Sequence, residues 1–513
     1  MQFEKIFCAV RLSYVEITGG TDMRASLRAM LLGACLTAIS VGGTTLASAE
    51  PAAASAARAP VVAVTKHTGT FNGQKVAYKA IVAETILTDA AGAPTGSLVT
   101  TAYVREGVAA AERPVLFLFN GGPGASTTPL HFGAFGPKKR TDDGPDQRMV
   151  DNPDSLLDAV DLVFIDPIGT GYSRPLPGVD GKRFWSRDGD AASVKTVMAQ
   201  WLKANGREAS PRYMLGQSYG TTRAALVADI GADLKLDGVL LFALVGYPPG
   251  REMPFVTTLS TFATTAWYHQ KVDRAGRSVQ QVHDEAVEFA RTAYVTALIK
   301  GASLPAADKR AAAEKMSALI GLPADFILAK DLRLSREDFM FNLLKDQGLR
   351  TGQLDGRATA RLDAPAKRPP YDDPGMGFAE PRPPGPKPTG VLPVAGGKSA
   401  LESYFKDTLK FRTAETYNSL NLDVNSAWDH QGMADVNGLL GKAMQASPKM
   451  RLFWAAGYYD VTTPPYGARY ALDQAGVPGE RLTAAYFDGG HSVFTDPGNH
   501  AALSAAVRKF VRP

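Results

Sequence analysis

The chain has 513 residues, of which 45% are hydrophobic and 21% are charged, and its formal net charge is +5. This is the composition of a globular protein long enough for one large core and a sizeable insertion or second domain. So small a charge on a chain of this length argues against a nucleic-acid partner.

The N-terminal region differs in character from the rest. From Met23 onward, Arg24 and Arg28 precede a modestly apolar stretch that ends in an Ala-Ser-Ala run. This is the order of a secretory signal peptide. We therefore predict a signal peptide over residues 1–49, with Met23 as the true start and cleavage after Ala49.

Both cysteines, Cys8 and Cys35, precede that cleavage point, so the mature protein would contain no disulfide. Lipid attachment at Cys35 is an alternative, but the apolar run before it is short. No other segment has the length and apolar character of a membrane span. We expect an exported protein, periplasmic or extracellular, without stable membrane insertion.

Two kinds of apolar pattern follow along the chain. Between residues 61 and 104, short runs alternate apolar with polar residues, which is typical of antiparallel strands. Later runs, such as PVLFLFN, DLVFIDP, GVLLFALVG and RLFWAAG, are continuously apolar and separated in several places by helical stretches. Such runs indicate parallel strands covered on both faces. The prediction is an α/β core with a mostly parallel central sheet, formed by residues 61–247 and 449–513.

Residues 248–448 are far too many for a crossover between two strands. Their pattern is mainly helical, notably over 277–301 and 308–321, and a Pro-rich stretch follows at 365–390. We interpret them as a lid insertion, which commonly covers and selects substrate. A purely structural insertion is the alternative. The seven histidines are scattered without metal-ligand spacing, so we expect no metal site.

A candidate nucleophile lies where an apolar strand meets a helix. Gly216 and Gly220 flank Ser218 in the stretch YMLGQSYGTTRAAL. Glycines let the strand and the helix approach closely, and the serine hydroxyl then projects from a strained turn. The alternative is an ordinary turn in which Ser218 only caps the helix.

A serine nucleophile needs a base and an acid that orients the base. His491 follows a short strand and a Gly-Gly turn, whereas His500 lies where a helix begins. Asp460 lies on the loop after the apolar strand RLFWAAG, which fits the chain order serine, acid, histidine. Asp488 and Asp496 are competitors, although both resemble turn formers.

Donors for an oxyanion are expected from the Gly-rich loop after the strand that ends in FLFN. Glycines have no Cβ to shield the backbone there, so the Gly122 N–H can point into a cleft. Together with the N–H of Tyr219, it would form an oxyanion hole. A Gly-Pro-Gly turn without function is the alternative.

Four motifs in order, NGGPGAS at Asn120, DLVFIDPIGTGYS at Asp161, GQSYG at Gly216 and GGH at Gly489, resemble the serine carboxypeptidases, a branch of the α/β-hydrolases. The chain looks like a bacterial secreted member. The resemblance implies an acyl-enzyme mechanism, a peptide substrate with a free C-terminus, and no cofactor. It also implies these site residues: Ser218, Asp460 and His491 as the triad, Gly122 and Tyr219 as the oxyanion hole, and Asn120, Gly121 and Gln217 as substrate-binding residues.

The chain departs from the family where the substrate carboxylate is bound. Gln217 stands where the family has a glutamate, and a second family glutamate falls at Ala134 when counted without gaps. A glutamine amide can still donate to a carboxylate. The leading hypothesis is therefore a carboxypeptidase, and an esterase or acyltransferase on the same scaffold is the alternative. A catalytically silent binding protein is disfavoured, since no triad position is eroded. Oligomeric state and side-chain specificity stay open.

Overall fold

The computed structural model describes residues 59–141, 147–363, 373–374, 399–433 and 436–512. The chain divides into two units, residues 1–59 and 60–513. The predicted signal peptide, its cleavage point and Cys35 lie outside the described residues, as does nearly all of the Pro-rich stretch.

Within the described part of the chain, no helix is both long enough and apolar enough to span a bilayer.

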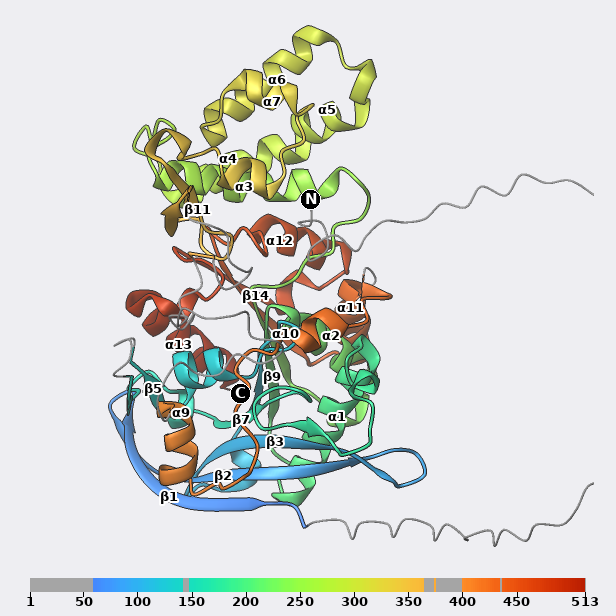
Figure 1. Cartoon of the computed structure of the whole chain (residues 1–513), viewed down its shortest axis with the longest axis vertical. Helices are drawn as coiled ribbons and strands as arrows, with labels where there is room; N and C mark the ends of the chain where they lie inside the picture. Colours follow the sequence, from blue (N-terminus) through green and yellow to red (C-terminus); the bar gives the residue numbers. More distant parts are fainter. Residues whose placement is uncertain (1–58, 142–146, 364–372, 375–398, 434–435, 513) are drawn as a thin grey trace, which may run out of the picture. The chain divides into compact units, whose positions relative to one another are not determined.

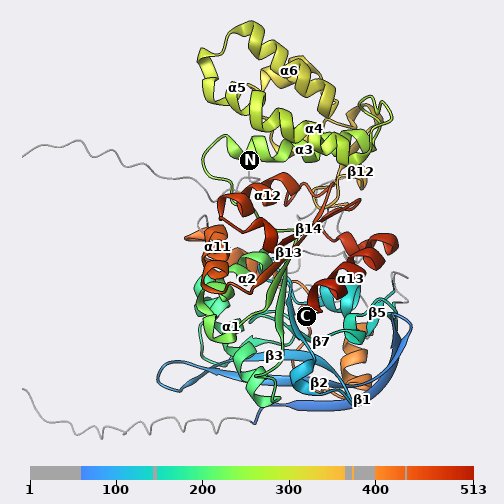
Figure 2. The same cartoon turned by 180° about the vertical axis from the view of Figure 1, so that it is seen from behind.

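One large sheet organises the second unit (Figures 1 and 2). It opens with three antiparallel strands and continues with six parallel ones. The order across the sheet is β1 (Val62–Phe71), β2 (Gln74–Thr88), β3 (Pro94–Arg105), β7 (Asp161–Ile165), β4 (Val115–Phe119), β9 (Arg212–Gln217), β10 (Gly238–Phe242), β13 (Arg451–Gly457) and β14 (Leu482–Phe487), with β8 (Arg174–Pro175) pairing β3. The predicted α/β-hydrolase fold is confirmed.

The central strands are continuously apolar because both of their faces are covered. Along β4, Leu116 and Leu118 pack into one cluster of buried side chains, while Val115 and Phe117 pack into another on the opposite face. The helices α1 (Arg187–Ala204), α2 (Tyr219–Ile230) and α11 (Val436–Ala446) contribute to the second cluster, and α13 (Pro497–Val511) contributes to the first.

The insertion has an apolar core of its own, in which Phe262 and Phe339 stack with ring centroids 4.2 Å apart. Its elements are α3 (Met253–Tyr268), α4 (Val279–Phe289), α5 (Val295–Lys300), α6 (Ala306–Ile320), α7 (Ala324–Ala329), α8 (Arg336–Met340) and the hairpin β11 (Leu349–Thr351) to β12 (Thr359–Arg361). We call these residues, 253–361, the lid helices and hairpin.

Residues after 399 pack differently from the lid helices, although the predicted insertion, 248–448, includes them. The Tyr417 hydroxyl donates to Asp166 at 3.0 Å, and Val436 and Leu440 of α11 belong to the core cluster around α2. Helical periodicity indicates an apolar face but not what covers it, so the sequence did not separate this part from the lid. The remaining helices near the site are α9 (Ala400–Ser403), α10 (Leu422–Ala427) and α12 (Pro465–Gln474).

Candidate active site

Ser218 occupies a strained turn between β9 and α2, with φ 58° and ψ −130°. Only glycine fits at the two flanking positions. A Cβ on Gly216 would lie 2.0 Å from the Gly220 carbonyl oxygen. A Cβ on Gly220 would lie 2.7 Å from the Phe119 carbonyl oxygen. Ser218 is the N-cap residue of α2, but its side chain makes no capping hydrogen bond within the described helix. The geometry therefore favours the nucleophile-elbow interpretation over the capping one.

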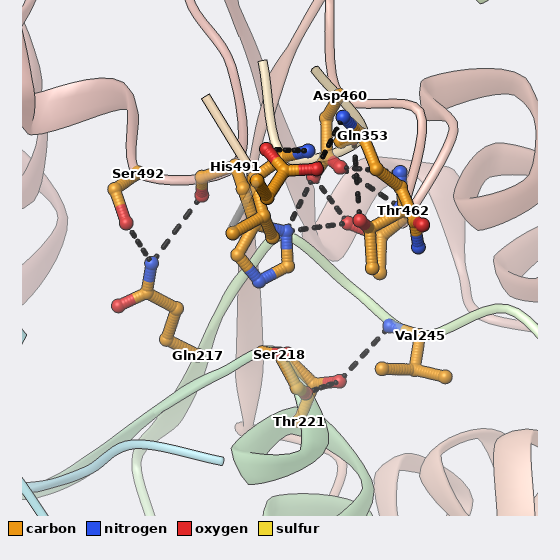
Figure 3. Close-up of polar contacts among 12 residues, drawn as sticks. Gln217, Ser218, Thr221, Val245, Gln353, Asp460, Thr462, His491 and Ser492 are labelled. Atoms are coloured by element: carbon orange, nitrogen blue, oxygen red, sulfur yellow. Dashed lines mark hydrogen bonds and ion pairs between the residues drawn. The ribbon is translucent and has the colours of Figure 1, made fainter. Parts of the chain in front are cut away.

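Asp460 and His491 lie together above this turn (Figure 3). Asp460 Oδ2 is 2.8 Å from His491 Nδ1, and their side chains are 1% and 12% exposed. The other Asp460 oxygen, Oδ1, accepts the N–H groups of Thr462 and Thr463, each at 2.9 Å. Thr463 Oγ1 also donates to Oδ2. The carboxylate is thus oriented on both oxygens, and the second ring nitrogen of His491 faces the side on which Ser218 lies.

The competing acidic and imidazole side chains have other partners. Asp496 caps α13 by accepting the Asn499 N–H at 3.0 Å, and the Asp488 side chain is 64% exposed. His500 is buried, with Nε2 2.8 Å from the Ala134 carbonyl oxygen. The structure therefore brings Asp460, rather than these aspartates, to His491.

A lid arginine faces the loop that bears Asp460. Arg336 Nη2 donates to the Thr462 carbonyl at 3.1 Å. Burial lowers the pKa of Arg336 and the nearby Asp460 carboxylate opposes that change. An arginine remains protonated at neutral pH, so the lid places a positive charge beside the loop that bears Asp460.

The Gly-rich loop lies against the start of α2. A Cβ on Gly121 would lie 2.4 Å from the Tyr219 nitrogen, and Gly122 follows with φ 100°. Tyr219 is the first residue of α2, so its N–H has no acceptor in a preceding helical turn. The structure brings Gly121, Gly122 and Tyr219 together, and the oxyanion hole stays a prediction for the N–H groups of the last two.

Asn120 and Gln217, predicted to bind substrate, are buried and bonded to each other. Asn120 Nδ2 donates to Gln217 Oε1 at 2.7 Å. Gln217 Nε2 donates to Ser492 Oγ at 2.9 Å and to the His491 carbonyl at 3.3 Å (Figure 3). Ala134, at the other departure from the family, is fully buried. The Gln217 amide therefore contacts the histidine loop, which we define as residues 488–492.

A segment of the β11–β12 hairpin, residues 353–357, contacts both loops of the Asp–His pair. The His491 N–H donates to the Leu354 carbonyl at 2.7 Å, and the Val461 N–H donates to the Gln353 carbonyl at 3.1 Å. In return, the Gly356 N–H donates to the Tyr459 carbonyl at 2.8 Å. We call residues 458–463 the acid loop. The 353–357 segment therefore joins the acid loop to the histidine loop.

Side chains strengthen this connection. Arg357 pairs with Asp355 at 2.8 Å, donates to the Asp488 carbonyl at 2.9 Å and lies over the Tyr459 ring at 5.0 Å. Sequence reasoning missed this segment because its main contacts use backbone groups, which every residue has. The weak clues are the Asp-Gly turn within it and Gly490, where a Cβ would lie 2.6 Å from the Leu354 carbonyl oxygen.

One segment of the chain matches a known protein family. Residues 103–236, which include the Gly-rich loop and Ser218, match the family model named Serine carboxypeptidase. This segment is similar to the serine carboxypeptidase family. The match confirms the resemblance drawn from the motifs.

A curated relative is similar to part of the chain. Serine carboxypeptidase-like 36 from Arabidopsis thaliana is 32% identical over 114 residues, which are 21% of this chain and 22% of the relative. The match thus spans about a fifth of the length of that serine carboxypeptidase-like protein. It does not reach far enough to carry an activity over to the whole chain.

Solved structures with low overall similarity also match. A peroxisomal α/β-hydrolase from Saccharomyces cerevisiae is 10% identical, with a TM-score of 0.36, over 88% of this chain and 90% of that one. Proline iminopeptidase from Mycobacterium smegmatis is 14% identical, with a TM-score of 0.33, over 87% and 97%. A carboxyl esterase from Bacillus coagulans is 12% identical, with a TM-score of 0.34, over 88% and 98%. The details of the site therefore rest on this chain's own geometry.

Proposed function

We propose that the protein is a serine hydrolase, and specifically a serine-type carboxypeptidase that hydrolyses C-terminal peptide bonds through an acyl-enzyme on Ser218. The observation that carries the proposal is the partly buried Asp460–His491 hydrogen bond beside the strained Ser218 turn. The family match of the segment containing Ser218 supports the carboxypeptidase class.

The proposed first step is acylation. Asp460 Oδ2 accepts the Nδ1 proton of His491, so the neutral imidazole has its lone pair on Nε2. Nε2 takes the proton of the Ser218 hydroxyl as Oγ bonds to the scissile carbonyl carbon. The imidazolium then gives that proton to the leaving amine as the C–N bond breaks. An acyl-enzyme ester on Ser218 remains, and the released C-terminal amino acid of the substrate departs.

The proposed second step is hydrolysis of that ester. His491 Nε2 removes a proton from water, the hydroxide adds to the acyl carbon, and the proton returns to Ser218 Oγ as the ester bond breaks. In both steps the negative oxygen of the tetrahedral intermediate would accept the N–H groups of Gly122 and Tyr219. Each such donor is typically worth about 10²- to 10³-fold in kcat. The chemistry uses no cofactor.

One observation favours the alternative, an esterase or acyltransferase. Both Nε2 protons of Gln217 are directed at acceptors on the histidine loop. The predicted glutamine ligand of a substrate carboxylate is therefore already engaged. Asn120 Nδ2 donates one of its two protons to Gln217 Oε1, and its second proton can donate to another group. Recognition of a free C-terminus would depend on this remaining proton and on lid groups.

The test uses one blocked dipeptide in three forms: free acid, C-terminal amide and p-nitrophenyl ester. A carboxypeptidase would show at least a tenfold higher kcat/KM for the free acid than for the amide. Equal rates on acid and amide, or turnover of the ester alone, would support the alternative function.

The Ser218→Ala variant tests the nucleophile. It should lower kcat by about 10⁴-fold or more on every form that the wild type hydrolyses, without a change in the unfolding midpoint. Ser303→Ala, which removes an exposed hydroxyl in the lid, is the matched control and should leave kcat unchanged. Hydrolysis that persists in purified Ser218→Ala protein would refute the assignment.

Export is part of the same proposal. The composition of residues 23–49 supports cleavage after Ala49 and a periplasmic or extracellular enzyme. Mass spectrometry of the N-terminal peptide of the exported protein would identify the cleavage point. A mature protein that retains residues 1–49, or that carries lipid on Cys35, would contradict this part.

A further inference from the structure

The side-chain amide of Gln217 joins three parts of the site. Gln217 is the last residue of β9, directly before the nucleophile, and is 2% exposed. Its oxygen accepts from Asn120 at the end of β4, and its nitrogen donates to Ser492 and to the His491 carbonyl. One amide therefore connects the Gly-rich loop, the nucleophile strand and the histidine loop.

Backbone groups fix the orientation of both amides in this chain of hydrogen bonds. At one end, the Leu130 N–H can only donate, and Asn120 Oδ1 accepts it at 3.2 Å. Asn120 must then present its nitrogen to Gln217 Oε1. At the other end, the His491 carbonyl can only accept, so it faces Gln217 Nε2. Neither amide can be reversed without placing two donors or two acceptors together.

This arrangement leaves Gln217 no amide proton for a substrate carboxylate, because its two protons have two acceptors on the histidine loop. We propose that Gln217 is a positioning residue that holds the backbone of His491 in register with Ser218, rather than a ligand of the substrate's C-terminus. The inference rests on the proposed function, in which His491 is the general base for Ser218.

The choice of glutamine over glutamate then has a physical reason. An amide does not titrate, so it donates to the histidine loop at every pH. A carboxyl at this position would donate only when protonated, and then through a single proton. Once ionised, it would place an acceptor against the His491 carbonyl, and a buried pair of acceptors repels, although the Ser492 hydroxyl can turn to donate. The hydrogen bonds from Gln217 to the histidine loop are therefore independent of pH.

Other titratable groups lie on the elements packed around Gln217, and a pH experiment has to separate them from position 217. Arg223 donates to the Asn120 carbonyl and pairs with Asp190 at 2.6 Å, and buried His131 lies 2.8 Å from the Tyr103 hydroxyl. The full set is His491, Asp460, Arg223, Asp190, His131 and Tyr103. All of these are present in the wild type, so dividing the kcat of a variant by the wild-type kcat at each pH cancels their common contribution.

The experiment compares Gln217→Glu with the wild type between pH 5 and pH 9. Two substrates are used: the p-nitrophenyl ester of the blocked dipeptide, which has no free carboxylate, and the free-acid dipeptide. The rate at which an organophosphonate labels the serine reports nucleophile activation without any substrate. Gln280→Glu places the same charge on an exposed position of α4 and is the matched control.

We expect the ratio of variant to wild-type kcat to be highest at acid pH, no more than several-fold below one, because the protonated carboxyl keeps one of the two donated hydrogen bonds. It should then fall about 10- to 100-fold as the introduced carboxyl ionises, the scale of loss expected for a misplaced catalytic group. The fall should occur equally with the ester, the free acid and the phosphonate, while KM changes little. Gln280→Glu should give a ratio of one throughout.

Two results would overturn the inference: a loss confined to the free-acid substrate and expressed in KM, or a ratio that does not change with pH. If Gln217→Glu fails to fold, the ester kcat of Ser492→Ala tests the inference instead. That variant removes one of the two acceptors and should lower the ester kcat several-fold, and an unchanged ester kcat would refute the inference. Failure of the proposed function is separate, since it would appear as turnover in Ser218→Ala protein.

Discussion

Replacing Gly490 by alanine tests whether the 353–357 segment sets the position of His491. The new Cβ would lie 2.6 Å from the Leu354 carbonyl oxygen and 2.6 Å from Asp355 Cβ. Ordinary contact begins at 3.4 Å, so the histidine loop and the segment must separate by about 0.8 Å. Overpacking of this kind costs about 1–3 kcal/mol of folding free energy. A shift near 1 Å in a catalytic group can cost about 10²-fold in rate.

We therefore expect Gly490→Ala to lower kcat on the p-nitrophenyl ester by about 10- to 100-fold with a small change in KM. Stopped-flow ester hydrolysis and urea unfolding would measure the two effects. Gly479→Ala is the control, because a Cβ there has nothing within 4 Å. A Gly490→Ala enzyme that is less stable but retains wild-type kcat would refute the idea that the segment positions the histidine.

Two further predictions concern charged side chains. Arg357→Ala removes the contacts to Asp355 and the Asp488 carbonyl, and should lower kcat about tenfold, whereas Arg361→Ala in the exposed Arg361–Asp363 pair should change kcat by less than about twofold. Equal kcat values for these two variants in the ester assay would contradict the role given to Arg357. Arg223→Met leaves Asp190 buried without its partner and should cost about 3–5 kcal/mol in urea unfolding. The double variant with Asp190→Leu should recover most of that loss, and no recovery would mean that Arg223 acts mainly through its bond to the Asn120 carbonyl.

The sequence predicted those features that depend on residue type at one position. Continuously apolar runs identified β4 and β7 because a strand buried on both faces carries mostly apolar side chains. The elbow around Ser218 could be predicted because only glycine fits at the close contacts on either side. Asp460 was predicted from its place after a strand, and in the structure its Oδ2 lies 2.8 Å from His491 Nδ1.

The features that the sequence did not predict depend on contacts between distant backbone groups. The carbonyl of Leu354 accepts the His491 N–H, yet any residue at either position could make that bond. Gln217 was predicted as a substrate ligand from its residue type alone. Its neighbours in space, Asn120 and Ser492, are 97 and 275 residues away along the chain, and no local pattern reveals such a network.

The acid loop is held by the lid as well as by the sheet that precedes it. The Val461 side chain is buried in the apolar core of the lid helices. Thr264 of α3 donates to the Tyr458 carbonyl at 2.7 Å, and Arg336 of α8 donates to the Thr462 carbonyl. Ser218, in contrast, is fixed by β9 and α2 of the core.

Movement of the lid helices relative to the sheet would therefore displace Asp460, and through the 353–357 segment also His491, relative to the nucleophile. Substrate binding that fixes the lid would at the same time fix the geometry of the proposed triad. Because a general base contributes to rate only within hydrogen-bond reach of the proton it abstracts, contacts between lid and substrate should then appear in kcat as well as in KM.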